Sequence, residues 1–144
     1  MISIATSEEL PEIFDLLVSA HIGVAHDWRA DVVARASLEN HLAGCCALDF
    51  VEATSILHSL TVVKSKRRIG VGSALVEYCV EIASDRGAED IALLTMFWNV
   101  NFFRKNGFST TSRSLLPRSL ANNPLIYDSV LRRATPMIRR LACL

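Results

Sequence analysis

The sequence predicts a mixed α/β domain (α+β), in which a mostly antiparallel sheet contains one parallel pair of central strands and is flanked by helices. Three apolar segments between residues 31 and 63 follow one another through short connections. Short connections favour an antiparallel meander, because parallel neighbours need a long crossover. The stretch from Ile56 to Thr95 instead reads strand, helix, strand, which gives a right-handed parallel crossover. We expect one domain over residues 1–144.

Composition narrows the classes of function. The 15 Lys and Arg residues balance the 15 Asp and Glu residues, so no overall charge points to nucleic acid or to a membrane surface. Hydrophobic residues make up 51% of the chain, yet no apolar run is long enough to span a bilayer. The N-terminal residues lack the pattern of a secretion signal, and a cytoplasmic location is expected. The apolar content is also compatible with a homodimer.

The four cysteines form no C-x-x-C pair, so we expect no metal site. Cys45 and Cys46 are adjacent on an expected strand, and their side chains should point to opposite faces. That opposition argues against a shared metalloid site. Reduced, mostly buried thiols are the favoured interpretation.

The first half of the chain opens with an expected strand at Ile2–Ala5. Thr6 and Glu9 have the spacing of a capping box, and a helix should run to about Ala20. Residues 21–30 show no clear period and are expected to form a loop. The apolar face of the helix comprises Leu10, Ile13, Phe14, Leu17 and Val18. The expected meander comprises Asp31–Ala36, a turn at Leu38–His41, Leu42–Val51 and Ile56–Val63.

The second half alternates shorter elements. Gly87 and Gly107 are natural ends for the two helices expected there. A buried stripe on the longer helix is expected from Leu75, Cys79, Ile82 and Ala83. The expected elements are a helix at Ser73–Asp85, a strand at Asp90–Thr95, a helix at Asn99–Asn106, a strand at Phe108–Ser112, a turn or short helix at Leu115–Leu120 and a strand between Met137 and Leu141.

The loop at Lys64–Gly72 is basic, contains two glycines and precedes a helix, which is the arrangement of a phosphate pocket. Ser73 and Ala74 follow the second glycine where a P-loop needs Lys and Ser or Thr, so a P-loop is excluded. Leu75 excludes the dinucleotide fingerprint in the same way. An ordinary glycine-rich turn with solvated charges is the plainer alternative.

What does fit is R-x-x-G-x-G, at Arg67, Gly70 and Gly72, after a strand that ends in L-x-V. This pattern resembles the acetyl-CoA loop of the GNAT superfamily of N-acetyltransferases. The order of elements along the chain is also similar to that superfamily, and Phe102–Phe108 resembles its aromatic-x-x-x-G-F helix ending. The features Phe102-Phe103, Leu116-Pro117 and Met137 resemble small amino-acid N-acetyltransferases, including N-acetylglutamate synthase domains and arsenic-resistance N-acetyltransferase-like proteins.

The resemblance implies that the fourth and fifth strands splay apart and that acetyl-CoA is the co-substrate, lying between them. Its pantetheine amides would pair with backbone at 61–63, and its diphosphate would meet the N–H groups of residues 68–73. A backbone N–H near Val62 or Val63 would stabilise the oxyanion. The expected cofactor contacts are Thr61, Val62, Val63, Arg67, Arg68, Ile69, Gly70, Val71, Gly72, Ser73, Asn99 and Phe103.

The catalytic groups depart from the superfamily's pattern. Phe103 occupies the place where a tyrosine often protonates the departing thiolate, so that role is vacant and falls to water or another residue. Met96 and Asn99 replace the usual asparagine and alanine. Phe103 then packs against the core or the pantetheine.

For the general base the candidates are His58 and Glu52, with His21 and His26 as further histidines. Histidine is the side chain whose ordinary pKa suits base chemistry near neutrality. His58 is expected to share a strand face with Ile56, Leu60 and Val62. The plainer alternatives are a hydrogen-bonded core histidine, a solvated turn glutamate and a chain of water to bulk.

For the acceptor, Arg29, Arg35 and Arg113 could each bind a carboxylate, although each is otherwise a surface charge. The resulting hypothesis is transfer of an acetyl group from acetyl-CoA to the primary amine of a small, amino-acid-like acceptor in a ternary complex. A rival is a CoA-binding or ligand-sensing module without turnover, and a third reading is an interaction protein with an empty cleft.

Overall fold

The computed structural model describes residues 1–20, 28–116 and 133–141. The candidates His21 and His26, and most of the turn expected at Leu115–Leu120, lie outside these residues. The strands are β1 (Ile2–Ile4), β2 (Val32–Leu38), β3 (His41–Val51), β4 (Thr54–Val62), β5 (Asp90–Thr95), β6 (Ser109–Thr110) and β7 (Thr135–Arg140). The helices are α1 (Leu10–Ser19), α2 (Val71–Asp85) and α3 (Val100–Lys105), with 3-10 turns η1 (Lys64–Lys66), η2 (Phe97–Asn99) and η3 (Arg113–Leu115).

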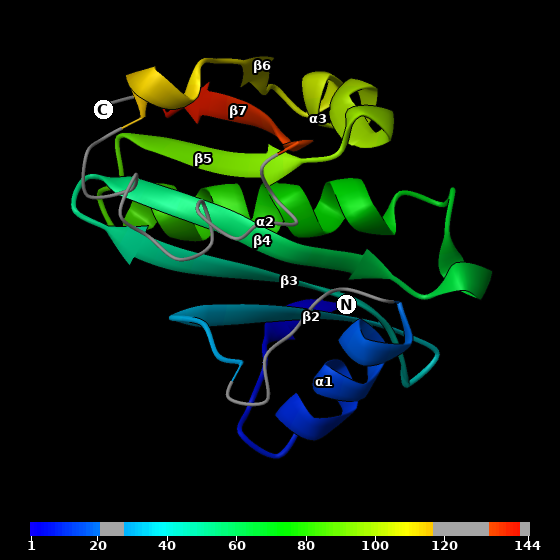
Figure 1. Ribbon diagram of the computed structural model, residues 1–144. Helices are drawn as coiled ribbons and strands as arrows, with labels where there is room; N and C mark the ends of the chain where they lie inside the picture. The colour runs from blue at the N-terminus through cyan, green and yellow to red at the C-terminus, as the bar shows by residue number, and fades with distance from the viewer. Residues whose placement is uncertain (21–27, 117–132, 142–144) are drawn as a thin grey trace. The chain divides into compact units, whose positions relative to one another are not determined.

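The seven strands are hydrogen-bonded in the order β1-β2-β3-β4-β5-β7-β6 (Figure 1). Strand β5 runs parallel to β4, with Thr54 to Ile56 paired to Asp90 to Ala92. The pairs β1–β2, β2–β3, β5–β7 and β6–β7 are antiparallel. The mixed, mostly antiparallel sheet with a parallel central pair is therefore confirmed. Splaying of β4 from β5 stays a prediction.

Contacts divide the chain into two compact units. The first comprises Met1–Asp49 and Leu57–Glu81, and the second comprises Phe50–Ile56 and Ile82–Leu144. The expectation of a single domain stays a prediction. Within the described residues, no helix is both long enough and apolar enough to cross a bilayer.

The N-terminal cap of α1, in the first unit, differs from the capping box that the sequence predicted. Helix α1 begins at Leu10, and its N-cap residue Glu9 makes no side-chain cap hydrogen bond. Instead, Glu9 Oε1 accepts from the backbone N–H of Thr6 at 2.9 Å and from its hydroxyl at 3.2 Å. Only the backward half of the capping box therefore forms, because the chain makes a turn before the helix starts. Val18, expected on the buried face, is 50% exposed.

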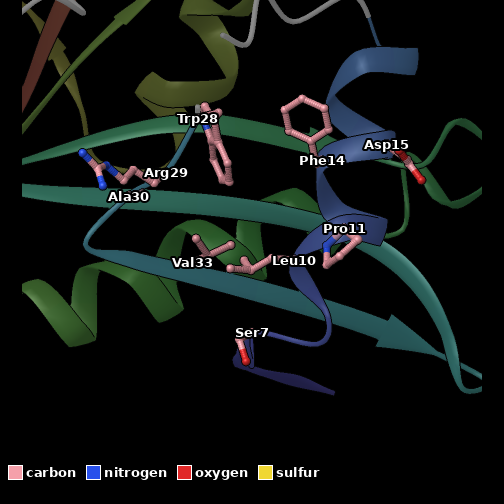
Figure 2. Close-up of a pocket in the computed structure, with 9 residues that line it drawn as sticks. All are labelled: Ser7, Leu10, Pro11, Phe14, Asp15, Trp28, Arg29, Ala30 and Val33. Carbon is pink, nitrogen blue, oxygen red and sulfur yellow. The ribbon is translucent and has the colours of Figure 1, made fainter. Parts of the chain in front are cut away.

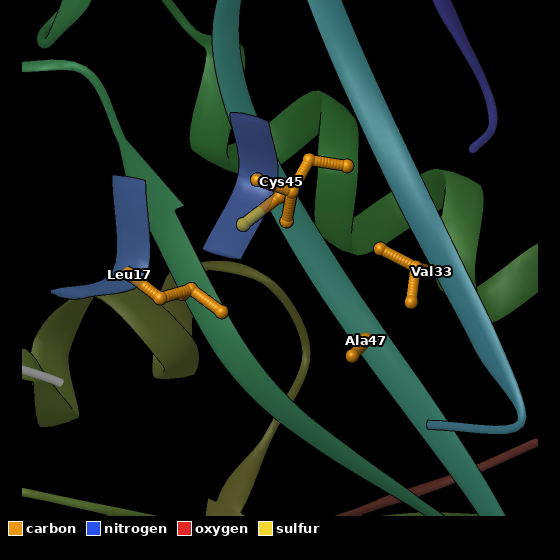
Figure 3. Close-up of a cluster of buried hydrophobic side chains, with 5 residues drawn as sticks. Leu17, Val33, Cys45 and Ala47 are labelled. Atoms are coloured by element: carbon orange, nitrogen blue, oxygen red, sulfur yellow. The ribbon is translucent and has the colours of Figure 1, made fainter. Parts of the chain in front are cut away.

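The adjacent residues Cys45 and Cys46 lie on opposite faces of β3, as predicted. Cys45 packs in the cluster of Ile13, Leu17, Val33 and Ala47 under α1 (Figure 3). The Cys46 thiol instead meets Cys79 of α2. The two helices therefore cover opposite faces of this part of the sheet.

Burial of these thiols leads to a prediction about their reactivity. Burial raises the pKa of Cys45 to about 12 and also raises the pKa of Cys46. Since the thiolate is the reactive form, we expect Cys45, Cys46 and Cys79 to resist Ellman's reagent at pH 8 in the native protein. In a Cys143→Ser variant, all three should react only after unfolding. Rapid reaction of one full equivalent in the folded state would contradict this burial.

Two local features of the first unit differ from the sequence prediction. Strand β4 carries Ser59 at φ 58, a left-handed conformation in the middle of a strand. Helix α2 begins at Val71, so Gly72 lies in the first turn of the helix and not in the loop before it. The turn between β2 and β3 is as predicted, with Glu39 at φ 51 and Asn40 at φ 64, as a tight type I′ hairpin requires.

The second unit is built on β5 between β4 and β7. Its buried polar pair, Thr54 and Asp90, joins the first residues of the parallel strands by a 2.7 Å hydrogen bond. The end of α3 is closed by Gly107 at φ 90, and Phe108 N–H donates to Phe103 O at 3.0 Å. This arrangement is a C-terminal cap of the kind glycine permits, as the sequence predicted.

Candidate active site

The segment after β4 forms an open, basic turn. Arg67 folds back, and its Nε donates to Val62 O at 3.1 Å. Arg68 and Gly70 both have left-handed backbones, with φ of 67 and 90. Among the described residues, no atom lies within 4 Å of a Cβ added to Gly70, so glycine is required there by the backbone angle and not by crowding. The space beside the Gly70 Cα is therefore clear of the described residues, which suits close approach of a ligand to the backbone.

Helix α2 leaves its first N–H groups available at this turn. Its hydrogen-bond ladder starts with Ala74 N–H donating to Gly70 O at 3.0 Å. The N–H groups of Val71, Gly72 and Ser73 therefore have no partner inside the helix, and they lie at the positive end of its dipole. Unpaired donors, an open glycine and neighbouring arginines suit a diphosphate group.

The end of β4 narrows the choice of oxyanion donor. Val63 N–H donates to Ala43 O at 2.8 Å, so it is committed to β3. Because successive N–H groups of a strand point to opposite edges, the N–H of Val62 faces the edge away from β3. Val62 is therefore the better of the two expected donors. The neighbouring Thr61 is 6% exposed, and its hydroxyl has no hydrogen-bond partner among the described residues.

His58 lies at the centre of a polar cluster in the first unit. Its Nδ1 is 2.9 Å from Ser59 Oγ, and its Nε2 is 3.0 Å from Asp49 Oδ2. Ser59 Oγ also accepts a hydrogen bond from Trp28 Nε1 at 3.2 Å, and the Trp28 and His58 rings meet edge to face. The side chains of His58 and Asp49 are only 13% and 23% exposed. This cluster contains a base candidate with a carboxylate behind it.

The hydrogen-bond roles in the cluster follow from what each group can donate. An indole N–H only donates, so Ser59 Oγ accepts from Trp28. The oxygen has a second lone pair, so the direction of its contact with His58 Nδ1 depends on the histidine tautomer. Asp49 Oδ2, 3.0 Å from Nε2, favours the tautomer that is protonated on Nε2, in which the Ser59 hydroxyl donates to Nδ1. Neutral His58 then carries its proton on Nε2, which faces Asp49. The 3.0 Å contact between Nε2 and Asp49 Oδ2 is bent away from ideal hydrogen-bond geometry, so the hydrogen bond that Asp49 receives from the ring is a weak one. The arrangement leaves His58 ready to accept a proton through Nδ1.

The carboxylate of Asp49 is held in its charged form. Burial alone would raise the pKa of Asp49, but hydrogen bonds from His58 and from the backbone N–H of Asp31, at 3.0 Å, outweigh burial and lower it. A lowered folded pKa contributes stability that is fully present above the unfolded value of about 3.9 and is lost as pH falls through the folded value.

We therefore expect Asp49→Asn to reduce the free energy of unfolding at pH 7 and to lose less of its stability than wild type below pH 4. Urea unfolding at pH 7, 5, 4 and 3 measures both effects. The gap between the two proteins should close as pH falls. A gap that stays constant over this range would show that the charge of Asp49 contributes nothing to folding.

A pocket of about 360 Å³ opens beside the cluster in the same unit. Figure 2 shows Leu10 and Phe14 projecting from α1 on one side, with Trp28 and Val33 on the other. Arg29 also lines the pocket and is exposed. Trp28 therefore contacts both the pocket and Ser59. Of the three arginines expected to bind an acceptor carboxylate, Arg29 is the one that lines this pocket.

The other two arginines have structural partners. Arg35 is ion-paired with Glu9 at 3.3 Å and with Glu12 at 3.8 Å, and its side chain is 15% exposed. Arg113 donates to Ala134 O at 3.2 Å. Both guanidinium groups thus serve to hold elements together, and we do not assign them to the acceptor.

The remaining candidates belong to the second unit. Glu52 is exposed in the tight turn before β4, at φ 56, which is the position of a solvated turn carboxylate. Phe103 is 5% exposed and packs edge to face with Phe102 and Phe108, so it serves as a core residue. Asn99 is exposed at the start of α3. Among the described residues there is no group of three or more side chains suited to a metal ion.

Sequence reasoning missed Asp49, Ser59 and Trp28. Asp49 could have been found by counting back from the turn between β3 and β4, which makes it a diagonal neighbour of His58 on the same face. Ser59 could not have been found in this way, because in a regular strand consecutive side chains point to opposite faces of the sheet, which would put Ser59 on the face away from His58. The left-handed backbone of Ser59 breaks that alternation and brings its hydroxyl beside the His58 ring.

Comparison with known sequences identifies the family. The profile of the acetyltransferase (GNAT) family matches residues 3–108. The chain is 27% identical over 109 residues to an uncharacterised N-acetyltransferase of Chlorobaculum tepidum, covering 75% of this chain and 63% of that relative. The chain therefore belongs to the GNAT acetyltransferase family.

Solved structures agree on the fold. The N-acetylglutamate synthase of Neisseria gonorrhoeae, complexed with coenzyme A and L-arginine, superposes with a TM-score of 0.79 at 24% identity, over 99% of this chain and 33% of that one. Rv2747 of Mycobacterium tuberculosis, in complex with CoA and NLQ, gives 0.83 at 17% identity over 99% of both chains. These likenesses show that the fold is shared with proteins that bind CoA.

Proposed function

We propose that this chain transfers an acetyl group from acetyl-CoA to the primary amine of a small, amino-acid-like acceptor, by direct attack in a ternary complex. The observation that carries the proposal is the open turn of Gly70 at the free N–H groups of α2, on a chain of the GNAT family. Acetyl-CoA supplies an activated thioester carbonyl. The protein supplies binding, orientation and proton transfer.

The cofactor end of the site uses backbone donors. The N–H groups of Val71, Gly72 and Ser73 hold the diphosphate, and the charge of Arg68 supports them. Arg67 contributes by fixing the strand end, because its Nε is bound to Val62 O. The Val62 N–H, on the edge away from β3, is our choice for the oxyanion donor.

The proton of the attacking amine goes to His58. Asp49 behind the ring stabilises the imidazolium that forms, since a neighbouring carboxylate favours the charged form of histidine. Phe103, at the place of the usual acid, has no proton to give and is buried, so it does not protonate the thiolate. A thiol with an ordinary pKa of about 8.5 can leave as thiolate without such an acid.

The acceptor occupies the pocket beside Trp28. Its apolar side chains contact the body of the acceptor, and Arg29 binds the carboxylate. We expect Arg29→Gln to raise the KM for L-phenylalanine by about tenfold or more, in keeping with the strength of a charge-assisted hydrogen bond. The KM for n-propylamine, which has no carboxylate, should not change. An equal change in KM for both amines would show that Arg29 does not bind the acceptor carboxylate.

The proposed function is tested by coenzyme A release from acetyl-CoA in the presence of L-phenylalanine, L-glutamate or n-propylamine. We expect release that depends on the amine, with the N-acetylated product identified by mass spectrometry. The buried Phe103 favours one alternative, a module that binds CoA without turnover. That alternative predicts thermal stabilisation by CoA with no release for any amine.

A further inference from the structure

Ser59 combines a strained backbone with two polar side-chain partners, Trp28 and His58. A non-glycine residue at φ 58 inside a strand is sterically strained and is kept only where the surroundings demand it. Residues held in such sparsely populated backbone conformations cluster at active sites and ligand-binding sites. Here the conformation turns the hydroxyl of Ser59 toward the ring of the preceding residue, His58.

The hydrogen-bonding capacity of the hydroxyl is filled except at one position. A serine hydroxyl has one proton to donate and two lone pairs. One lone pair accepts from Trp28 Nε1, and the proton points to His58 Nδ1. Among the described residues the second lone pair has no partner, and Ser59 is partly exposed. A group that donates an N–H can therefore bind there.

Trp28 connects this free position to the acceptor pocket. Its indole lines the pocket, while its N–H fixes the orientation of the Ser59 hydroxyl. His58 itself is 13% exposed, and its Nδ1 is covered by Ser59. Neither Ser59 nor His58 is among the residues that line the pocket, so Trp28 is the link between the pocket and the Ser59 hydroxyl.

We propose that Ser59 is a catalytic residue that relays the proton of the acceptor amine to His58. As the amine nitrogen bonds to the thioester carbon, its proton passes to Ser59 Oγ and the hydroxyl proton passes to His58 Nδ1. The C–S bond then breaks, the sulfur leaves with the electron pair, and the imidazolium returns its proton through Ser59 or water to the thiolate. The serine is unchanged at the end of the cycle. The net products of the reaction are the amide and coenzyme A.

The relay rests on the proposed acetyl transfer. The variant that tests it most directly is Ser59→Gly. Glycine removes the hydroxyl but accepts φ 58 without strain, so the variant should fold. With L-phenylalanine, L-glutamate or n-propylamine as acceptor, we expect kcat to fall about a hundredfold, the low end for a lost general base, with the KM for acetyl-CoA unchanged. Ser84→Ala on the exposed face of α2 is the matched control and should retain full activity.

A second measurement needs no turnover. The ¹⁵N resonances of the His58 ring should show the proton on Nε2 and an accepting Nδ1 in wild type, and the Nδ1 signal should shift in Ser59→Gly. Wild-type kcat in Ser59→Gly would overturn the relay and leave acetyl transfer standing. Absence of transfer by the wild-type protein to any of the three amines would overturn the proposed function, and the relay with it. An unchanged Nδ1 signal would show that the hydroxyl does not serve His58 at all.

Discussion

Replacing Gly70 by asparagine should reduce the affinity for acetyl-CoA by about a hundredfold or more. Asparagine tolerates a left-handed backbone better than other side chains, and its Cβ would meet no atom of the described residues within 4 Å. The fold should therefore survive at a cost on the order of 1 kcal/mol. The new side chain, however, occupies the space through which the diphosphate reaches the N–H groups of α2. Isothermal titration with acetyl-CoA measures the loss.

The chain offers a closely matched control at the other end of the same helix. Gly87 also has a left-handed backbone, at φ 84, and a Cβ added to it likewise meets no atom within 4 Å in the part of the chain that the structure describes. Gly87→Asn should carry a similar stability cost and leave acetyl-CoA affinity unchanged. If both variants weaken binding equally, the effect comes from general loss of stability, and the diphosphate does not sit at Gly70.

Replacing His58 by glutamine should lower kcat by about 100-fold to 1,000-fold, within the range for loss of a general base. Glutamine keeps a polar group near Asp49 but cannot take up a proton at neutral pH. The KM for acetyl-CoA should stay the same, because His58 is not among the residues that hold the cofactor. Steady-state kinetics with saturating L-phenylalanine separates the two parameters.

His41 provides the control for this variant, since it is exposed at the start of β3. His41→Gln should have the kinetics of wild type. Full activity in His58→Gln would assign proton removal to solvent, and the cluster of His58, Asp49 and Ser59 would then be a structural feature of β4. The relay through Ser59 would be excluded by the same result.

Much of the fold could be predicted because its signals are local. The spacing of Arg67, Gly70 and Gly72 after an apolar strand located the basic turn, and two glycines at helix ends located the caps at Gly87 and Gly107. Short connections gave the antiparallel meander, and the long crossover gave the parallel pair. In each case the signal is the residue type or the length of a connection, and both can be read directly from the sequence.

The site was less accessible to sequence reasoning because it depends on tertiary contacts. His58 and Arg29 could be named as candidates from their residue types. Nothing about serine predicts a left-handed backbone at position 59. In the structure this backbone occurs together with contacts of the hydroxyl to Trp28 and His58. The pairing of Arg35 on β2 with Glu9 and Glu12 was equally hidden, since these carboxylates lie at and just before the start of α1, far from β2 in the sequence.

The central claim is that the first turn of α2 binds the diphosphate of acetyl-CoA. An NMR titration of ¹⁵N-labelled protein with acetyl-CoA tests it most directly, through the backbone amides of Gly70, Val71, Gly72 and Ser73. These four amides should show the largest shift changes, and Gly70→Asn should abolish them. If acetyl-CoA leaves these amides unmoved, or shifts only amides elsewhere in the chain, the site is not where we have placed it.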